Sequence, residues 1–106
     1  MTKKDQTSWK KRNKKMSFKK FCEYRSWLFL EFPVCQICGD HASCEAHHAK
    51  YGMFGADRDD RYIVALCHPC HHEIHHGRGG YEKLGITRDE VEIIGELNYE
   101  RFKNSQ

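Results

Sequence analysis

The segment CHPCHHEIHH, residues 67–76, concentrates two cysteines and five histidines in ten residues. Thiolates and imidazoles are the usual protein ligands of zinc and of related transition metals. Neither a buried core nor an exposed loop requires so many of these side chains in so short a stretch. Their density predicts that this segment binds metal.

Two C-x-x-C pairs, separated by 28 residues, supply four cysteines that suit a single zinc ion. Thiolates are soft ligands, and four of them at this spacing favour tetrahedral zinc. Such a site leaves no coordination position open for chemistry, so its role is structural. We therefore expect a structural Zn²⁺ bound by Cys35, Cys38, Cys67 and Cys70.

An alternative assignment divides the cysteines and histidines into two structural zinc sites of mixed ligands, which would make the protein a plain zinc-binding module. Cys22 has no ligand role in either assignment, and we expect it to be a small buried apolar side chain. The first mixed site would consist of Cys35, Cys38, Cys44 and His47, and the second of Cys67, Cys70, His71 and His75.

Four histidines that follow Cys70 form two pairs with helical spacing. His71 and His75 are four residues apart, so on a helix they lie on one face. His72 and His76 have the same spacing but are rotated by about 100° around the helix axis. We expect His71 and His75 to face the rest of the domain, with His72 and His76 pointing outward.

The dipeptide His47-His48 supplies a third ligand and a neighbouring imidazole. In an extended segment, adjacent side chains point to opposite sides of the chain. One histidine can therefore bind an ion while the other faces away from it, toward water or a substrate. Three imidazoles favour Zn²⁺, Ni²⁺, Mn²⁺ or Co²⁺ over Mg²⁺.

The elements that must position these ligands can be read from hydrophobic spacing. Aromatic and apolar residues between Phe18 and Leu30 recur at helical spacing and predict a helix over residues 17–32, which Pro33 ends. Short strands are expected at residues 44–48 and 61–66. The second strand is rich in β-branched residues and leads directly into the second cysteine pair.

The segment after Cys70 is expected to continue as a helix up to Gly77, where the sequence GRGG breaks it. Thr87 and Glu90 form a capping box that opens a last helix over residues 87–102. The order of elements predicts an α+β protein whose centre is a β-β-α unit carrying a C-x-x-C pair at each end.

Basic residues are concentrated near the N-terminus. Residues 1–20 contain nine Lys or Arg and one acidic residue, whereas the rest of the chain contains nine Lys or Arg and 14 acidic residues. Residues 1–16 lack hydrophobic periodicity, which predicts a disordered basic arm ahead of a single domain over residues 17–106. A basic arm favours a polyanionic partner, and nucleic acid is the usual one.

Neither a secretion signal nor a membrane span is visible in the sequence. The N-terminal residues contain no apolar run, and no stretch approaches the roughly 20 apolar residues of a membrane-spanning helix. Cysteine pairs in a chain without a secretion signal fit metal ligands better than disulfides. We expect a cytoplasmic protein with no membrane partner.

The order of these motifs resembles the HNH, or ββα-metal, nuclease superfamily. The resemblance rests on an HH dipeptide, a loop, a strand ending in LC-x-x-CH and a further histidine four residues later. It covers about 40% of the chain, residues 35–76, and is similar to small zinc-stapled members of phage type. It implies a ββα-metal (HNH) core over residues 35–77 with flanking N- and C-terminal helices, in a protein encoded by a phage or a bacterium.

By this resemblance, the histidines would have separate roles. His47, His71 and His75 would bind a catalytic divalent ion, which is Mg²⁺, Mn²⁺, Ni²⁺ or Zn²⁺. His48 stands where the family places its general base.

One position departs from the family pattern. The family's middle residue is usually an Asn that helps to brace the loop aiming the base, and it falls here at Tyr62. The carboxylate of Asp60 is a candidate for bracing the loop instead.

The resemblance implies metal-dependent hydrolysis of DNA phosphodiester bonds, and nothing in the sequence indicates readout of a particular base sequence. The alternative function is a non-catalytic zinc-binding module that binds nucleic acid through its arm. His48 separates the two, because a binding module has no use for a second histidine beside the ligand. The residues expected to contact nucleic acid are Lys10, Lys11, Arg12, Lys14, Lys15, Arg61 and Arg78.

Overall fold

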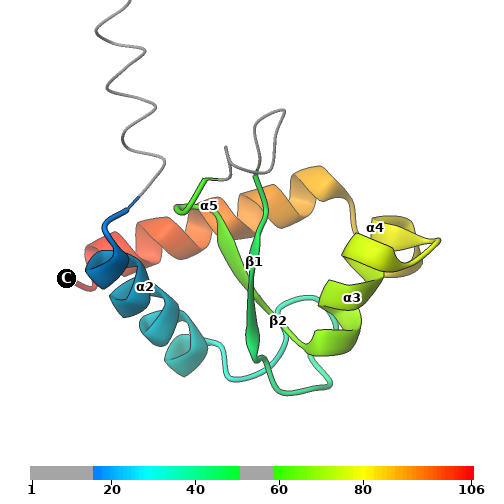
Figure 1. Cartoon of the computed structure of the whole chain (residues 1–106), viewed down its shortest axis with the longest axis horizontal. Coiled ribbons are helices and arrows are strands. Elements are labelled where there is room, and N and C mark those ends of the chain that lie inside the picture. Colours follow the sequence, from blue (N-terminus) through cyan, green and yellow to red (C-terminus); the bar gives the residue numbers. More distant parts are fainter. Residues whose placement is uncertain (1–15, 51–58) are drawn as a thin grey trace, which may run out of the picture.

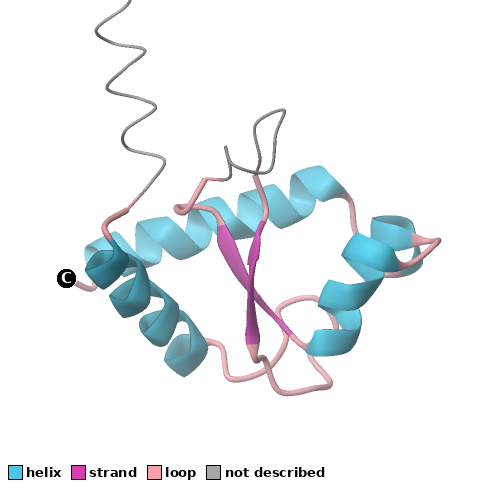
Figure 2. Cartoon of the chain, viewed as in Figure 1, coloured by secondary structure: helices cyan, strands magenta, loops and turns pink. Residues whose placement is uncertain are grey.

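The computed structural model describes residues 16–50 and 59–106, and within them the chain forms four helices and one two-stranded antiparallel sheet (Figures 1 and 2). The expected α+β class is therefore confirmed. Figure 1 shows the sheet between α2 at one end and the pair α3 and α4 at the other, with α5 running along all of them. The elements are α2 (Phe18–Glu31), β1 (Glu45–His48), β2 (Ile63–Leu66), α3 (His68–His76), α4 (Gly80–Lys83) and α5 (Arg88–Asn104).

The second strand, β2, is buried along its whole length, which explains its continuous apolar sequence IVAL. Its alternate residues face two separate hydrophobic clusters. Val64 and Leu66 pack with the cysteines and the start of α5, whereas Ile63 and Ala65 pack with aromatic residues of α2 and the end of α5. The sheet therefore separates a metal-ligand side, covered by α3, from an aromatic side, covered by α2.

Helix α2 packs through a narrow stripe centred on Tyr24 and Leu28, both fully buried. The Tyr24 ring stacks on Phe102 of α5, with ring centroids 4.7 Å apart. The predicted helix is confirmed, but the apolar pattern overstated its buried face. Phe18 and Leu30 are each 84% exposed, and Cys22 is exposed rather than buried, because α2 meets the domain along one side only.

Helix α4 was not predicted from the sequence, which indicated a break at GRGG. The break is real, since Gly80 has a positive φ of 53°. A single short helix nevertheless follows immediately, and its Tyr81 and the adjoining Leu84 pack against the cluster that contains the cysteines. This turn brings the chain back toward the sheet before α5 begins.

Helix α5 starts with the predicted capping box: Glu90 N donates to Thr87 Oγ1 at 3.1 Å, and Thr87 N donates to Glu90 Oε1 at 3.0 Å. Asn98 is buried and donates to the carbonyl of Ile63 at 2.9 Å, which fastens the helix to β2. Neither α5 nor any other helix in the described part of the chain is long and apolar enough to cross a membrane.

Candidate metal centres

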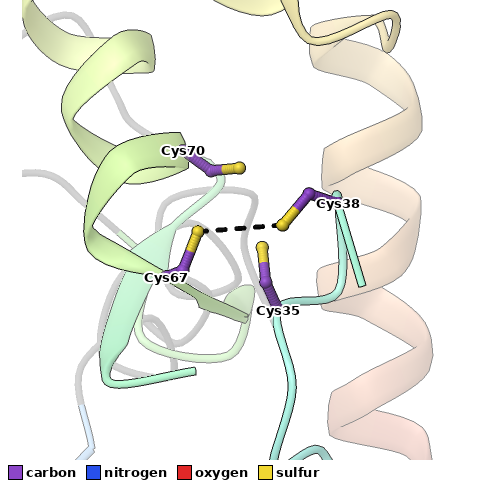
Figure 3. A group of neighbouring side chains, drawn as sticks. All are labelled: Cys35, Cys38, Cys67 and Cys70. Atoms are coloured by element: carbon purple, nitrogen blue, oxygen red, sulfur yellow. Dashed lines mark hydrogen bonds between the residues drawn. The ribbon is translucent and has the colours of Figure 1, made fainter. Parts of the chain in front are cut away.

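Four cysteine sulfurs point toward a common centre (Figure 3). The sulfur atoms lie within 4.8 Å of one another, and Cys38 Sγ is 3.9 Å from Cys67 Sγ. Two sulfurs bound to the same tetrahedral zinc, at about 2.3 Å each, are about 3.8 Å apart. The grouping of Cys35, Cys38, Cys67 and Cys70 is thus compatible with a structural metal site.

Two local structures hold these cysteines. The first pair sits on a turn that Gly39 closes with a φ of 69°, and Asp40 N lies 3.5 Å from Cys38 Sγ. On the other side, Cys67 is the N-cap of α3 and Cys70 lies in its first turn. The centre therefore ties the loop after α2 to the start of α3.

The thiols of Cys70 and Cys35 have pKa values shifted in opposite directions. Burial raises the pKa of Cys70, and contacts with Cys67 and Cys35 raise it further. Burial also acts on Cys35, but backbone N–H groups of Cys67, Cys38 and Ile37 outweigh it and lower the pKa of this thiol to about 6. Zinc binds thiolates, so full ionisation of the group would be coupled to binding of the ion.

Cys44 takes no part in this grouping. It is exposed and belongs to neither cluster of potential metal ligands in the described residues. His47 lies with His71 and His75 rather than with the first cysteine pair. The described ligand residues therefore do not group as the two mixed zinc sites would require.

A second centre consists of three imidazoles, one from β1 and two from α3. Potential ligand atoms of His47, His71 and His75 lie within 4.8 Å of one another, and the Nε2 atoms of His71 and His75 are 3.0 Å apart. Two nitrogens bound to one tetrahedral zinc are about 3.4 Å apart. The donor set fits a divalent ion with three protein ligands, which leaves a coordination position for water or a substrate.

Strand alternation explains why His47 and His48 differ. In the sheet, His47 lies opposite Val64 and His48 opposite Ile63, so the two histidines are on different faces. His47 is fully buried on the α3 side. His48 packs on the α2 side, where its ring stacks on Phe21 with centroids 5.6 Å apart.

The protonation of the imidazole group is set by burial and by crowding. Burial lowers the pKa of His47 to about 3, and neighbouring His71, His75 and His48 act in the same direction. Burial also lowers the pKa of His75. Neutral imidazole is the form that binds metal, so this environment favours the ligand state.

Asp60 holds His48 directly. His48 Nε2 lies 3.0 Å from Asp60 Oδ1, and Asp60 Oδ2 accepts a hydrogen bond from Met16 N at 3.1 Å. Tyr62, at the position where the family places Asn, lies instead with its ring 4.8 Å from Lys50 Nζ. The carboxylate next to His48 thus comes from two residues earlier in the chain.

Sequence reasoning missed Glu45, which contacts two histidines of α3. Its carboxylate oxygens lie 2.6 Å from His71 Nδ1 and 2.8 Å from His68 Nδ1, and these hydrogen bonds lower the pKa of Glu45. A carboxylate on Nδ1 directs Nε2 of the same ring toward an ion. The sequence signal that was available is the two-residue repeat of a strand, which places Glu45 on the same face of β1 as His47.

No family model, curated protein or solved structure matches the chain. The chemistry of the site therefore has to follow from its own residues. Those residues are two clusters of potential metal ligands, an adjacent pair of histidines and a carboxylate on each of His71 and His48.

A cavity of about 200 Å³ opens beside two of the three histidines, His47 and His75. Tyr81 lies on its wall, with its hydroxyl 3.3 Å from His47 Nε2. Arg88, the first residue of α5, lies there too and is exposed. Both residues follow the histidine motif in the sequence, and nothing in their spacing marked them as part of the site.

The predicted nucleic-acid contacts have different positions. Arg61 is paired with the buried carboxylate of Asp59, with nitrogen-to-oxygen distances of 2.9 and 2.8 Å, so its charge is largely neutralised within the domain. Arg78 is exposed just after α3. The basic-arm residues Lys10, Lys11, Arg12, Lys14 and Lys15 lie outside the described residues.

Proposed function

We propose that the protein is a metal-dependent endonuclease of the HNH, or ββα-metal, type that hydrolyses DNA phosphodiester bonds. The observation that carries the proposal is the meeting of His47, His71 and His75, with His48 next in the chain and held by Asp60. Three imidazoles leave part of a divalent ion's coordination sphere open, unlike the four cysteines. Phosphodiester hydrolysis requires a substrate-binding ion and a base, and the three imidazoles and His48 could supply them.

Hydrolysis of a diester requires charge neutralisation, a nucleophile and stabilisation of the leaving oxygen. A divalent ion bound by the three imidazoles would offset charge on the phosphate and on the departing oxygen. His48 accepts the proton of the attacking water, because a neutral imidazole is an effective base near pH 7. If the Nε2–H of His48 donates to Asp60, the basic lone pair is on Nδ1.

The cysteine cluster supports this chemistry from a distance. An ion there would fix the start of α3 against the loop after α2, and α3 carries His71 and His75. We assign Zn²⁺ to this structural role, and Mg²⁺, Mn²⁺, Ni²⁺ or Zn²⁺ to the histidine site. DNA is the proposed partner because of the excess of basic residues in residues 1–20.

Cleavage of supercoiled plasmid tests the proposal. Protein cleared of loosely bound ions is incubated with plasmid and Mg²⁺, Mn²⁺, Ni²⁺ or Zn²⁺. We expect the parent to nick the plasmid, and His48→Ala to lower the rate by about 100-fold or more. His72→Ala, an exposed histidine on α3, is the matched control and should cleave like the parent. DNA binding without cleavage in every ion would contradict the proposal.

The second candidate function is a non-catalytic zinc-binding module that binds nucleic acid. One observation favours it: the His48 side chain is only 12% exposed, stacks on Phe21 and is paired with Asp60, as a purely structural histidine would be. Under this alternative, the plasmid stays intact in every ion, and His48→Ala binds DNA as the parent does if the variant is folded.

A further inference from the structure

We propose that the cavity beside His47 and His75 binds the phosphoryl group of the substrate, and that Arg88 supplies the positive charge for this site. The inference rests on the proposed function, which it deepens by assigning a substrate-binding residue outside the histidine motif. Arg88 belongs to α5, so the site would join the β-β-α unit to the C-terminal helix.

The lining of the cavity suits an oxyanion. Of the described residues on its wall, none is acidic; they are His47, Ile74, His75, Tyr81 and Arg88. Its volume of about 200 Å³ accommodates a phosphate group together with water molecules. Two of the candidate metal ligands form part of the wall, so a phosphate oxygen in the cavity lies next to the histidine centre.

Arg88 lines the cavity with a charge that is not already engaged, unlike Arg61 and Arg101. Arg61 is paired with Asp59, and Arg101 lies over the Phe32 ring at 5.2 Å. Among the described residues, no ion pair or ring contact involves Arg88. A guanidinium with free donors can form two parallel hydrogen bonds to one phosphate, which an ammonium cannot do.

Tyr81 adds a neutral polar group to the same wall. Its hydroxyl lies 3.3 Å from His47 Nε2, so it is close to both the histidine centre and the cavity. Phenol groups commonly donate to phosphate oxygens. The short helix α4 places Tyr81 here, and the chain then reaches Arg88 within seven residues.

Binding of inorganic phosphate to the full-length, metal-loaded protein tests the site without requiring catalysis. Calorimetric titration is expected to show that Arg88→Gln weakens phosphate binding by about tenfold or more. Arg88→Lys should retain part of the affinity, because it keeps the charge without the planar fork. The matched control is Arg101→Gln, an exposed arginine about 20 Å further along α5, which should bind phosphate like the parent.

Hydrolysis of bis(4-nitrophenyl) phosphate and of plasmid provides the second readout. Arg88→Gln should lower kcat/KM for both substrates by a similar factor, because the contact is to the phosphate and not to a base. Within residues 16–50 and 59–106, the Arg88 side chain forms no ion pair or hydrogen bond, so thermal unfolding of the variant should match the parent.

The outcomes separate this inference from the proposed function. If the parent hydrolyses neither substrate but binds phosphate, and Arg88→Gln binds phosphate more weakly than the parent, the anion site stands and the nuclease proposal fails. If the parent cleaves DNA while Arg88→Gln equals Arg101→Gln in phosphate binding and in kcat/KM, the nuclease proposal stands and the role of Arg88 is overturned.

Discussion

At the scale of single residues, the two histidines that matter most for the proposed chemistry are each oriented by a carboxylate. Glu45 lies on His71 Nδ1 at 2.6 Å, and Asp60 lies on His48 Nε2 at 3.0 Å. The contacts use different ring nitrogens. His71 thus presents Nε2 toward the candidate ion site, whereas in the proposed mechanism Nδ1 of His48 acts as the base.

Replacing Glu45 tests the first of these contacts. Glu45→Gln keeps the size of the side chain but removes its charge, so His71 loses the partner that orients its ring and raises its basicity. We expect the affinity of the histidine site for Mn²⁺ to fall by about 10- to 100-fold, with the zinc content unchanged. Paramagnetic resonance titration measures the first and metal analysis the second. Glu96→Gln, an exposed position on α5, is the control, and equal affinity in both variants would refute the role of Glu45.

Burial of His47 predicts a dependence of stability on pH. The pKa of this imidazole is lowered to about 3 in the folded protein and is about 6.5 in an unfolded chain. Between these values the unfolded chain binds a proton that the folded protein does not. The free energy of unfolding is therefore highest above pH 6.5 and falls as the pH drops, by up to about 1.4 kcal/mol per pH unit from this residue.

Urea denaturation between pH 5 and pH 7 measures this slope in protein cleared of the exchangeable ion. His47→Gln should show a shallower loss of stability with acid than the parent, and the exposed control His72→Gln should show the parental slope. A His47→Gln slope equal to that of the parent would mean that another group dominates the acid response.

The ligand pairs within the cysteine and histidine clusters could be predicted from the sequence, because spacing in each local element determines them. Two C-x-x-C turns and one i, i+4 pair need only local geometry, and strand alternation separates His47 from His48. Arg88 and Tyr81 could not be predicted, because their distance from the histidines depends on how α4 turns the chain back. The position of Asp60 beside His48 was suggested only as a brace for a loop.

At the scale of the elements, the sheet acts as a partition between two environments. Alternate residues of β2 face the cysteine cluster and the aromatic cluster, and α5 contacts both. Gly95 lets α5 approach closely, because a Cβ atom at this position would lie 3.0 Å from the backbone of Tyr62. The distance between α5 and β2 thus depends on the absence of a side chain.

Gly95→Ala tests this close packing. Alanine favours a helix by about 1 kcal/mol over glycine, but its methyl group would press on the Tyr62 backbone, which has little room to move. We expect the contact to outweigh the propensity, so the variant should be destabilised by about 1 kcal/mol or more in chemical denaturation. Glu96→Ala, the exposed neighbour, should be near neutral. A more stable Gly95→Ala protein would show that the helix can shift away freely.

The main elements could be predicted from hydrophobic periodicity and capping residues. The clearest was α5, because Thr87 and Glu90 mark its start. Helix α4 could not be predicted, since a short helix after GRGG has little sequence signal and is held by packing of Tyr81 and Leu84. For α2, the sequence pattern instead predicted a wider buried stripe than the structure has. An amphipathic pattern shows which residues can be buried, but the width of the covered stripe depends on the neighbouring elements.

At the scale of the whole molecule, a small domain carries its two candidate metal centres on the same side of the sheet. The aromatic cluster around Tyr24 and Phe102 stabilises the other side. A domain of this size has a modest core, so an ion at the cysteine centre would contribute a large part of the folding energy.

Removing one cysteine tests this contribution. Cys70→Ser should lose tight zinc and unfold or lose its cooperative thermal transition, because zinc-site binding energy exceeds the roughly 5 kcal/mol margin of a small domain. Circular dichroism and metal analysis measure both effects. The exposed Cys44, which belongs to neither cluster, offers the matched control Cys44→Ser. A stable, zinc-free Cys70→Ser protein would show that the centre is dispensable for folding.

The most direct test of the account couples occupancy of the histidine centre to cleavage. Mn²⁺ is titrated into zinc-loaded protein, and bound Mn²⁺ and plasmid nicking are measured at each point for the parent and for His71→Ala. We predict that nicking rises in proportion to filling of one Mn²⁺ site, and that His71→Ala loses both together. Plasmid that stays intact while the parent's site is fully occupied would contradict the account.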